Sequence, residues 1–235
     1  MVDVSSHLDE ILQDVEVLKM LAEKETRENA QTELREFKIN GLTLAHLAII
    51  NNRPRVLDYL LDEFISTELE DADGDTLLFY AVGAENPRAN ECVEELLNHQ
   101  ANVRHRNKNR ATPLMTAAYM DNLYAIEKLL EYGADINAHD NVGRSAIVHA
   151  ASNINIRIRR TFSMPSLEAI LTLLRAGASV EELYHSGYTL CIGSTDGMPT
   201  IVRLGDYSPS LLFRDDLCLA AVNLDNPHLM QYLLS

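Results

Sequence analysis

The feature that most constrains the fold of this chain is an internal repeat of about 33 residues. Each copy begins with Thr or Ser, continues with aliphatic residues and then reaches an alanine-containing stretch. The copies begin at Thr43, Thr76, Thr112, Ser145 and, in a weaker form, Thr189, and the apolar frame without the hydroxyl recurs from Asp215. The intervals are 33, 36, 33, 44 and 26 residues, so the departures correspond to insertions of three and eleven residues and a deletion of seven. A period of this length is typical of a solenoid.

Each copy carries the signals of two short helices. A Thr or Ser hydroxyl can cap the first helix, and Pro113 follows Thr112 at a position where proline is tolerated. Paired alanines allow helices to approach closely, and paired leucines such as Leu129 and Leu130 can fill the space between them. Because two short helices cannot bury their apolar faces alone, neighbouring copies must stack. We therefore expect an all-α solenoid of five to six helix–turn–helix units.

The register of these motifs resembles that of the ankyrin repeat family. The best copy runs from Arg110 to Gly143, with Thr112-Pro113-Leu114 at the start of its first helix and Gly133-Ala134-Asp135 after its second. In four copies a glycine stands two residues before the Thr or Ser, where the family turns its hairpin loop: Gly41, Gly74, Gly143 and Gly187. Arg110 takes that place in the third copy. The resemblance covers about residues 40–235 and implies a module that binds another protein.

The ends of the chain depart from the repeat. Residues 1–38 place apolar side chains at helical spacing behind a capping signal at Ser5 and Ser6. We expect an N-terminal helical cap there; an amphipathic helix that binds a partner is the alternative. Residues 39–235 form the predicted ankyrin-repeat domain, which is degenerate at 184–214.

Charge and cysteine content narrow the class of protein. With 35 acidic and 20 basic residues the formal net charge is −15, so the chain as a whole repels nucleic acid and anionic membranes. The three cysteines are scattered and never form a C-x-x-C pair, which disfavours a disulfide framework and a zinc knuckle. The acidic start of the sequence leads us to expect no secretory leader, and the printed sequence contains no stretch of 18 apolar residues. These features predict a cytoplasmic protein that binds no cofactor, metal, nucleic acid or membrane.

Two neighbouring hairpin tips carry opposite charge. The acidic tip, residues 68–75, holds five carboxylates, and the basic tip, residues 104–110, holds four formal positive charges and a histidine. One hypothesis is that the tips neutralise each other through exposed ion pairs, each worth about 0–1 kcal/mol. The other is that the basic tip binds an acidic segment of a partner, with an apolar contact from the end of the next first helix. The residues that this second hypothesis nominates are Arg104, Arg106, Lys108, Arg110, Tyr119 and Met120.

The eleven-residue insertion of the fourth copy is a second candidate contact. It combines three arginines with an aromatic residue: Arg157, Arg159, Arg160 and Phe162. Insertions in solenoids are loops, and loops carry function more often than cores do. We expect either a plain surface excursion or a flap that flanks the partner-binding surface. A nucleic-acid contact is opposed by the overall charge.

The sequence contains no complete catalytic or metal-binding motif. Residues 71–75 begin like a calcium loop, but Thr76 and Val82 stand at its sixth and twelfth positions, where glycine and glutamate are required. The repeat frame places Cys191 and Cys218 at packing positions in helices, and Cys92 at the start of a second helix. His46 occupies the histidine position of the family motif, where it braces the loop, whereas His149 is one residue further along and could face the groove.

We therefore expect a non-enzymatic protein–protein interaction module that binds its partner on its concave, hairpin-loop surface. Two alternatives stay open. One is an inhibitor or pathogen-type effector that occludes a target enzyme. The other is an enzyme whose site lies in the degenerate region 184–214.

Overall fold

The computed structural model describes two compact units, residues 1–109 and residues 110–235. Within them the described residues are 36–39, 41–63, 65–84, 89–152, 168–186, 188–192 and 199–203. The predicted N-terminal cap, apart from residues 36–38, lies outside the described residues. So does the insertion of the fourth copy, with Arg157, Arg159, Arg160 and Phe162.

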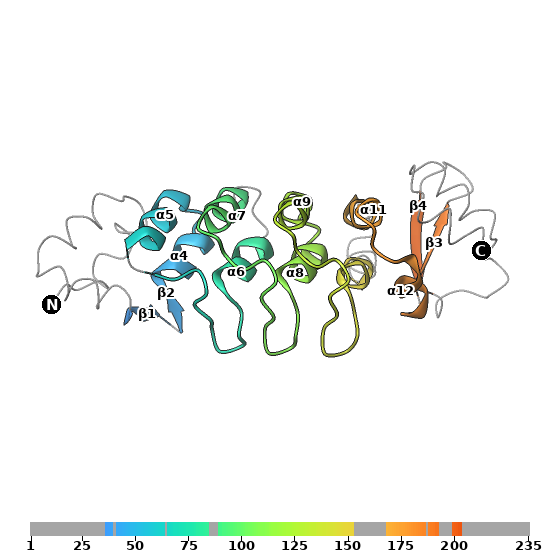
Figure 1. The fold of residues 1–235 in the computed structure, drawn as a ribbon, viewed down its shortest axis with the longest axis horizontal. Helices are drawn as coiled ribbons and strands as arrows, with labels where there is room; N and C mark the ends of the chain where they lie inside the picture. Colours follow the sequence, from blue (N-terminus) through green and yellow to red (C-terminus); the bar gives the residue numbers. More distant parts are fainter. Residues whose placement is uncertain are drawn as a thin grey trace, which may run out of the picture. The chain divides into compact units, whose positions relative to one another are not determined.

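The first unit is built from two helix pairs in two layers. Its elements are β1 (Lys38–Ile39), β2 (Leu42–Thr43), α4 (Leu44–Ile50), α5 (Pro54–Glu63), α6 (Leu77–Gly83) and α7 (Ala89–Asn98), with β1 and β2 antiparallel. Within each pair α4 packs on α5 and α6 packs on α7, and between the pairs α4 contacts α6 and α5 contacts α7. The loop that follows α5 extends from the layer of α4 and α6, away from α5 and α7 (Figure 1). This arrangement separates a loop side of the unit from an outer helical side.

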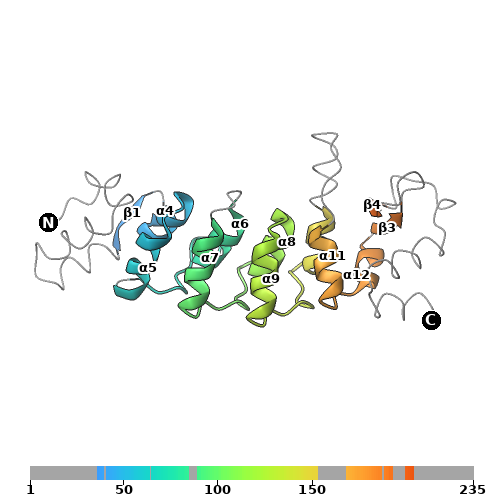
Figure 2. The same ribbon diagram turned by 90° about the horizontal axis from the view of Figure 1, so that it is seen from above.

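The second unit continues the same pattern and ends in a strand pair. Its elements are α8 (Pro113–Met120), α9 (Leu123–Glu131), a helical stretch over residues 146–152, α11 (Glu168–Arg175), α12 (Val180–His185), β3 (Tyr188–Ile192) and β4 (Pro199–Arg203). Helix α8 packs on α9, α9 contacts α11, and α12 contacts β3. Figure 2 shows α8 and α9 running alongside one another. Among the described residues, no helix has both the length and the apolar character that a membrane crossing requires.

The core consists of the residues that the repeat frame predicts. In the four predicted leucine pairs that the structure describes, the first leucine is fully buried: Leu60, Leu96, Leu129 and Leu173. The alanine pair Ala117 and Ala118 is buried as well, at 0% and 1% exposure. Small side chains on the first helix and leucines on the second therefore share the interior of each helix pair. The predicted all-α repeat fold is confirmed.

The helix starts use the Thr or Ser position in three different ways. The Thr112 hydroxyl accepts a hydrogen bond from the Met115 amide at 3.4 Å. Thr43 instead pairs with His46, whose Nδ1 lies 2.8 Å from the Thr43 hydroxyl and accepts the Thr43 amide hydrogen at 3.3 Å. The Ser145 hydroxyl is buried without a hydrogen-bond partner. Capping by the hydroxyl is thus confirmed at Thr112. At Thr43 the imidazole of His46 binds the Thr43 amide and hydroxyl, as its predicted loop-bracing role requires.

The fifth copy differs from the prediction. Its frame predicts a helix after Thr189, but this residue lies in β3, which pairs antiparallel with β4 so that Thr189 stands opposite Val202. The helical packing position predicted for Cys191 is therefore wrong, because Cys191 also belongs to β3. The two segments, YTLCI and PTIVR, are rich in β-branched and aromatic residues, which favour a strand. Cys218 lies outside the described residues.

Candidate functional site

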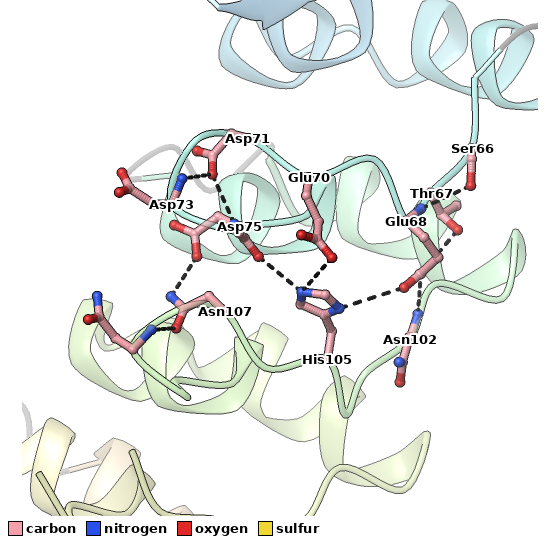
Figure 3. A network of polar contacts seen from close by, with 12 residues as sticks. Ser66, Thr67, Glu68, Glu70, Asp71, Asp73, Asp75, Asn102, His105 and Asn107 are labelled. Carbon is pink, nitrogen blue, oxygen red and sulfur yellow. Dashed lines mark hydrogen bonds and ion pairs between the residues drawn. The ribbon is translucent and has the colours of Figure 1, made fainter. Parts of the chain in front are cut away.

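The acidic tip and residues 104–109 of the basic tip lie in the first unit, where direct polar contacts join them (Figure 3). The Asn107 side-chain amide donates to Asp75 Oδ1 at 2.7 Å. The Lys108 backbone amide donates to the Asp73 carbonyl at 3.1 Å, and the Lys108 ammonium donates to the Ala72 carbonyl. Many of the bonds between the tips are therefore made by an asparagine side chain and by main-chain atoms, where the charge pattern predicts ion pairs.

His105 lies between the two tips and faces the acidic one. Its Nε2 is 3.0 Å from the Gly74 carbonyl oxygen and 3.7 Å from Glu70 Oε1, and its Nδ1 is 3.9 Å from Glu68 Oε2. Glu68 also accepts a hydrogen bond from the Asn102 amide at 2.9 Å. The imidazole is mostly buried, with 14% of its side chain exposed. His105 therefore belongs to the contact between the two tips and is not presented to a partner.

The shape of the acidic tip is set by Asp71. Its Oδ1 accepts the Asp73 and Asp75 amides at 2.8 and 2.9 Å, and its Oδ2 accepts the Tyr80 hydroxyl at 2.6 Å. Burial alone raises the pKa of Asp71, but these hydrogen bonds, with Tyr80 first, outweigh it and hold the pKa below its ordinary value. Burial and the same carboxylate raise the pKa of Tyr80. The tip is therefore fixed from within before any partner arrives.

The nominated binding residues are distributed over both units. Arg104, Arg106 and Lys108 lie in the first unit and are exposed. Arg110, Tyr119 and Met120 lie in the second unit, where Arg110 is exposed, Tyr119 is 36% exposed and Met120 is half-buried at the end of α8. The structure thus gives the arginines the accessibility that binding needs. It also gives Lys108 a bracing role that the charge pattern does not indicate.

Arg110 stands where the other copies turn on a glycine. Its φ of +58° is left-handed, like the φ of +84° at Gly143 in the same unit. A side chain other than glycine in this region costs roughly 1–2 kcal/mol. The hairpin turn is therefore kept in the third copy, with backbone strain beneath the exposed arginine.

A buried charge network holds the loop before the fourth copy. Asp140 accepts the Val142 and Arg144 amides, both at 2.9 Å, and pairs with the Arg144 guanidinium at 2.9 Å and with His149 Nε2 at 3.0 Å. Burial raises the pKa of Asp140, but the amides of Arg144 and Val142 and the two side chains outweigh it and bring the pKa to about 2. His149 therefore contacts Asp140, and the interpretation that it could face the groove is replaced by a structural role. Burial lowers the pKa of His149 more than Asp140 raises it.

Sequence reasoning missed the part played by the asparagines of the basic tip. Asn107 stands in the repeat where Asp71 and Asp140 stand in other copies, and its Oδ1 accepts the amide two residues further on, that of Asn109, at 3.0 Å. The repeat register carries this signal, since all three side chains make the same local turn. The contact of Asn107 with Asp75 has no such signal, because it depends on how closely the two loops approach.

Cys92 has the environment of a packing residue. It is fully buried in α7. Burial, followed by the charges of Glu91 and Glu95, raises the pKa of its thiol to about 12. A thiol in this state supplies almost no thiolate at neutral pH, so Cys92 is not suited to nucleophilic chemistry.

Comparison with known proteins adds independent findings. A family model for ankyrin repeats in three copies matches residues 11–103 and 82–182. Ankyrin repeat and SOCS box protein 6 of Homo sapiens is 31% identical over 185 residues, which cover 72% of this chain and 41% of that protein. The B-cell lymphoma 3 protein homolog of Mus musculus is 30% identical over 167 residues, which cover 68% of this chain and 34% of that protein. The chain spans less than half the length of these two curated relatives.

The fold is similar to a solved structure as well. The crystal structure of the ankyrin repeat domain of Bcl-3, described as a unique member of the IkappaB protein family, aligns with a TM-score of 0.59 at 26% sequence identity. The alignment covers 75% of this chain and 73% of that chain.

Proposed function

Because this chain belongs to the ankyrin repeat family, a family of protein–protein interaction modules, we propose that it binds an acidic segment of a partner protein through the exposed arginines of its basic tip. Arg104 and Arg106 are the main contacts in this proposal. Tyr119 and Met120 of α8 add the apolar contact, because aromatic and arginine side chains are the usual anchors of protein interfaces. Arg110 and the insertion with Arg157, Arg159, Arg160 and Phe162 are further candidate contacts in this proposal.

The joined tips are the observation that supports this proposal best. His105, Asn107 and Lys108 attach the basic tip to the acidic tip, while Arg104 and Arg106 lie exposed between and beside these contacts. A loop that is already fixed loses little conformational entropy when a partner binds. The arginines are thereby presented from a fixed backbone.

The test is a double charge reversal, Arg104→Glu with Arg106→Glu. Lys108 is left unchanged because it braces the acidic tip, so reversal there would alter the loop as well as the charge. The matched control reverses Arg53 and Arg55 to Glu; Arg53 immediately precedes α5 and Arg55 lies within it, and both are exposed in the first unit. The control makes the same change in net charge at the start of α5.

Partners are first recovered with the tagged wild-type chain from an extract of the source cells and identified by mass spectrometry. The affinity of the main partner for each purified variant is then measured by calorimetry, with circular dichroism as a check of folding. We expect the tip variant to bind at least tenfold more weakly, or about 1.4 kcal/mol, because two charged contacts are reversed. The control variant keeps wild-type affinity. Equal affinity of the tip variant and the wild type, with unchanged dichroism, would remove the basic tip from the binding surface.

A further inference from the structure

A second cluster of ionisable side chains lies away from the tips, between α5 and α7 of the first unit. Asp58 and Asp62 are one helical turn apart on α5, and His99 follows α7. His99 Nε2 is 2.9 Å from Asp58 Oδ1 and 3.8 Å from Asp62 Oδ1. One nitrogen and two carboxylate oxygens, from two consecutive helix pairs, all lie within 4.8 Å of one another.

These distances suit three ligands of one small cation. Zinc binds imidazole nitrogen and carboxylate oxygen at about 2.0–2.2 Å, so two ligand atoms of a tetrahedral ion lie roughly 3.2–3.6 Å apart. The observed distances from His99 Nε2, 2.9 and 3.8 Å, lie on either side of this range. The side chains of Asp58 and Asp62 are 47% and 62% exposed, which leaves room for a water molecule in the fourth position.

The local charge also favours a cation. Glu95 lies on α7 one turn before His99, and its negative charge and that of Asp58 repel each other. Three carboxylates therefore act on a single imidazole, and the last turn of α5 contains no basic residue. A divalent ion bound among these side chains relieves this repulsion.

We propose that Asp58, Asp62 and His99 form a site for a divalent transition-metal ion of the zinc type, which links α5 of one repeat to the end of α7 in the next. The imidazole separates this donor set from the all-oxygen sets that calcium and magnesium prefer. An ion bound only by the folded chain stabilises that fold by mass action. The bound ion would therefore hold two consecutive repeats together at the contact between α5 and α7. The sequence gives no motif for it, because His99 is 41 residues from Asp58.

The experiment is a calorimetric titration of the full chain, freed of metal by a chelator, with zinc chloride alone. The two site variants are His99→Gln and Asp62→Asn. The second leaves the closer Asp58–His99 contact intact while removing one ligand. The matched control is His139→Gln, because His139 lies in the second unit, outside the proposed site, and also pairs with a carboxylate, that of Glu182, at 3.2 Å.

We expect one zinc ion to bind the wild type and the control equally, and both site variants to bind at least tenfold more weakly. The midpoint of thermal unfolding should rise with zinc in the wild type and not in either site variant. Cobalt provides a second readout, since its absorption spectrum distinguishes nitrogen and oxygen ligands from thiolates and so separates this site from the cysteines.

Unchanged zinc affinity in both site variants overturns the proposal, as does a titration without heat up to millimolar zinc. The proposal is also overturned if His99→Gln is less stable than the wild type but zinc does not stabilise the wild type. In that case Asp58 and His99 form an ion pair only. Thiolate bands in the cobalt spectrum place the metal at cysteine and equally overturn the assignment. Circular dichroism of the metal-free variants establishes that each is folded before the titration.

Discussion

At the scale of single residues, the carboxylate of Asp140 is buried among several hydrogen-bond donors. Only 2% of its side chain is exposed, and it accepts hydrogen bonds from two amides, a guanidinium and an imidazole. A buried carboxylate is costly unless it is paired and hydrogen-bonded. The hydrogen bonds to Asp140 outweigh the cost of burying it, because they bring its pKa to about 2. The loop of residues 140–144 therefore depends on this residue being charged.

We expect Asp140→Asn to lower the free energy of unfolding by about 2 kcal/mol at pH 7. This loss corresponds to the difference between the ordinary pKa of the carboxyl group, 3.8, and its pKa of about 2 in the folded chain. Because the folded pKa is the lower one, this contribution is complete above about pH 5 and is lost as the pH falls from about 4 to about 2. Urea unfolding of variant and wild type from pH 7 to pH 3 measures it.

The difference between variant and wild type should shrink by about half at pH 3. The control is Asp135→Asn. Asp135 is exposed, and its Oδ1 accepts a hydrogen bond from the Asn137 amide at 3.0 Å. Asparagine can accept the same bond, so a change within about 0.5 kcal/mol is expected. A destabilisation in Asp140→Asn that stays constant down to pH 3 would show that packing, not charge, is what the substitution removes.

At the scale of elements, the contact between the two tips decides how the basic tip is presented. Gly74 lies at this contact with a φ of +79°, and a Cβ atom there would meet the Lys108 backbone nitrogen at 3.1 Å and its Cγ at 3.3 Å. That nitrogen is held by its hydrogen bond to the Asp73 carbonyl, so it cannot move away without cost. The two loops therefore approach as closely as they do only because one of them has no side chain at this point.

We expect Gly74→Ala to destabilise the first unit by more than Gly41→Ala does. Both glycines have left-handed φ, but nothing lies within 4 Å of a Cβ atom built on Gly41. The backbone penalty of about 1–2 kcal/mol is common to both, and the extra loss at Gly74 measures the steric cost of the contact with Lys108. Urea unfolding gives the two free energies. Equal losses would mean that the tips separate without cost.

The same elements show which features the sequence predicts and which it does not. Helix pairs, buried leucines and the turn at Asp71 follow from local periodicity and turn chemistry, which recur in the first four copies. The bonds of Asn107 and Lys108 to the acidic tip depend on the distance between loops and so could not be derived from charge alone. The β3–β4 pair was missed because Thr189 keeps the register of the repeat while the residues around it favour a strand.

At the scale of the whole molecule, the dominant property is the formal net charge of −15. Like charges repel one another more strongly in the folded chain than in the unfolded one, because folding brings them closer. Salt screens this repulsion, since the Debye length falls from about 30 Å at 0.01 M to about 8 Å at 0.15 M. The proposed complex depends on attraction instead, between the basic tip and an acidic segment. Salt must therefore act on stability and on binding with opposite signs.

We expect the midpoint of thermal unfolding of the isolated chain to rise as sodium chloride is increased from 10 to 150 mM, while the affinity for the partner falls over the same range. The variant with glutamate at positions 104 and 106 should lose this salt dependence of binding, whereas the variant changed at positions 53 and 55 should keep it. Scanning calorimetry and binding titrations at four salt concentrations provide both slopes from the same protein samples. An affinity that rises with salt, or that both variants reduce alike, would mean that the partner responds to the overall charge of the chain and not to the arginines of the basic tip.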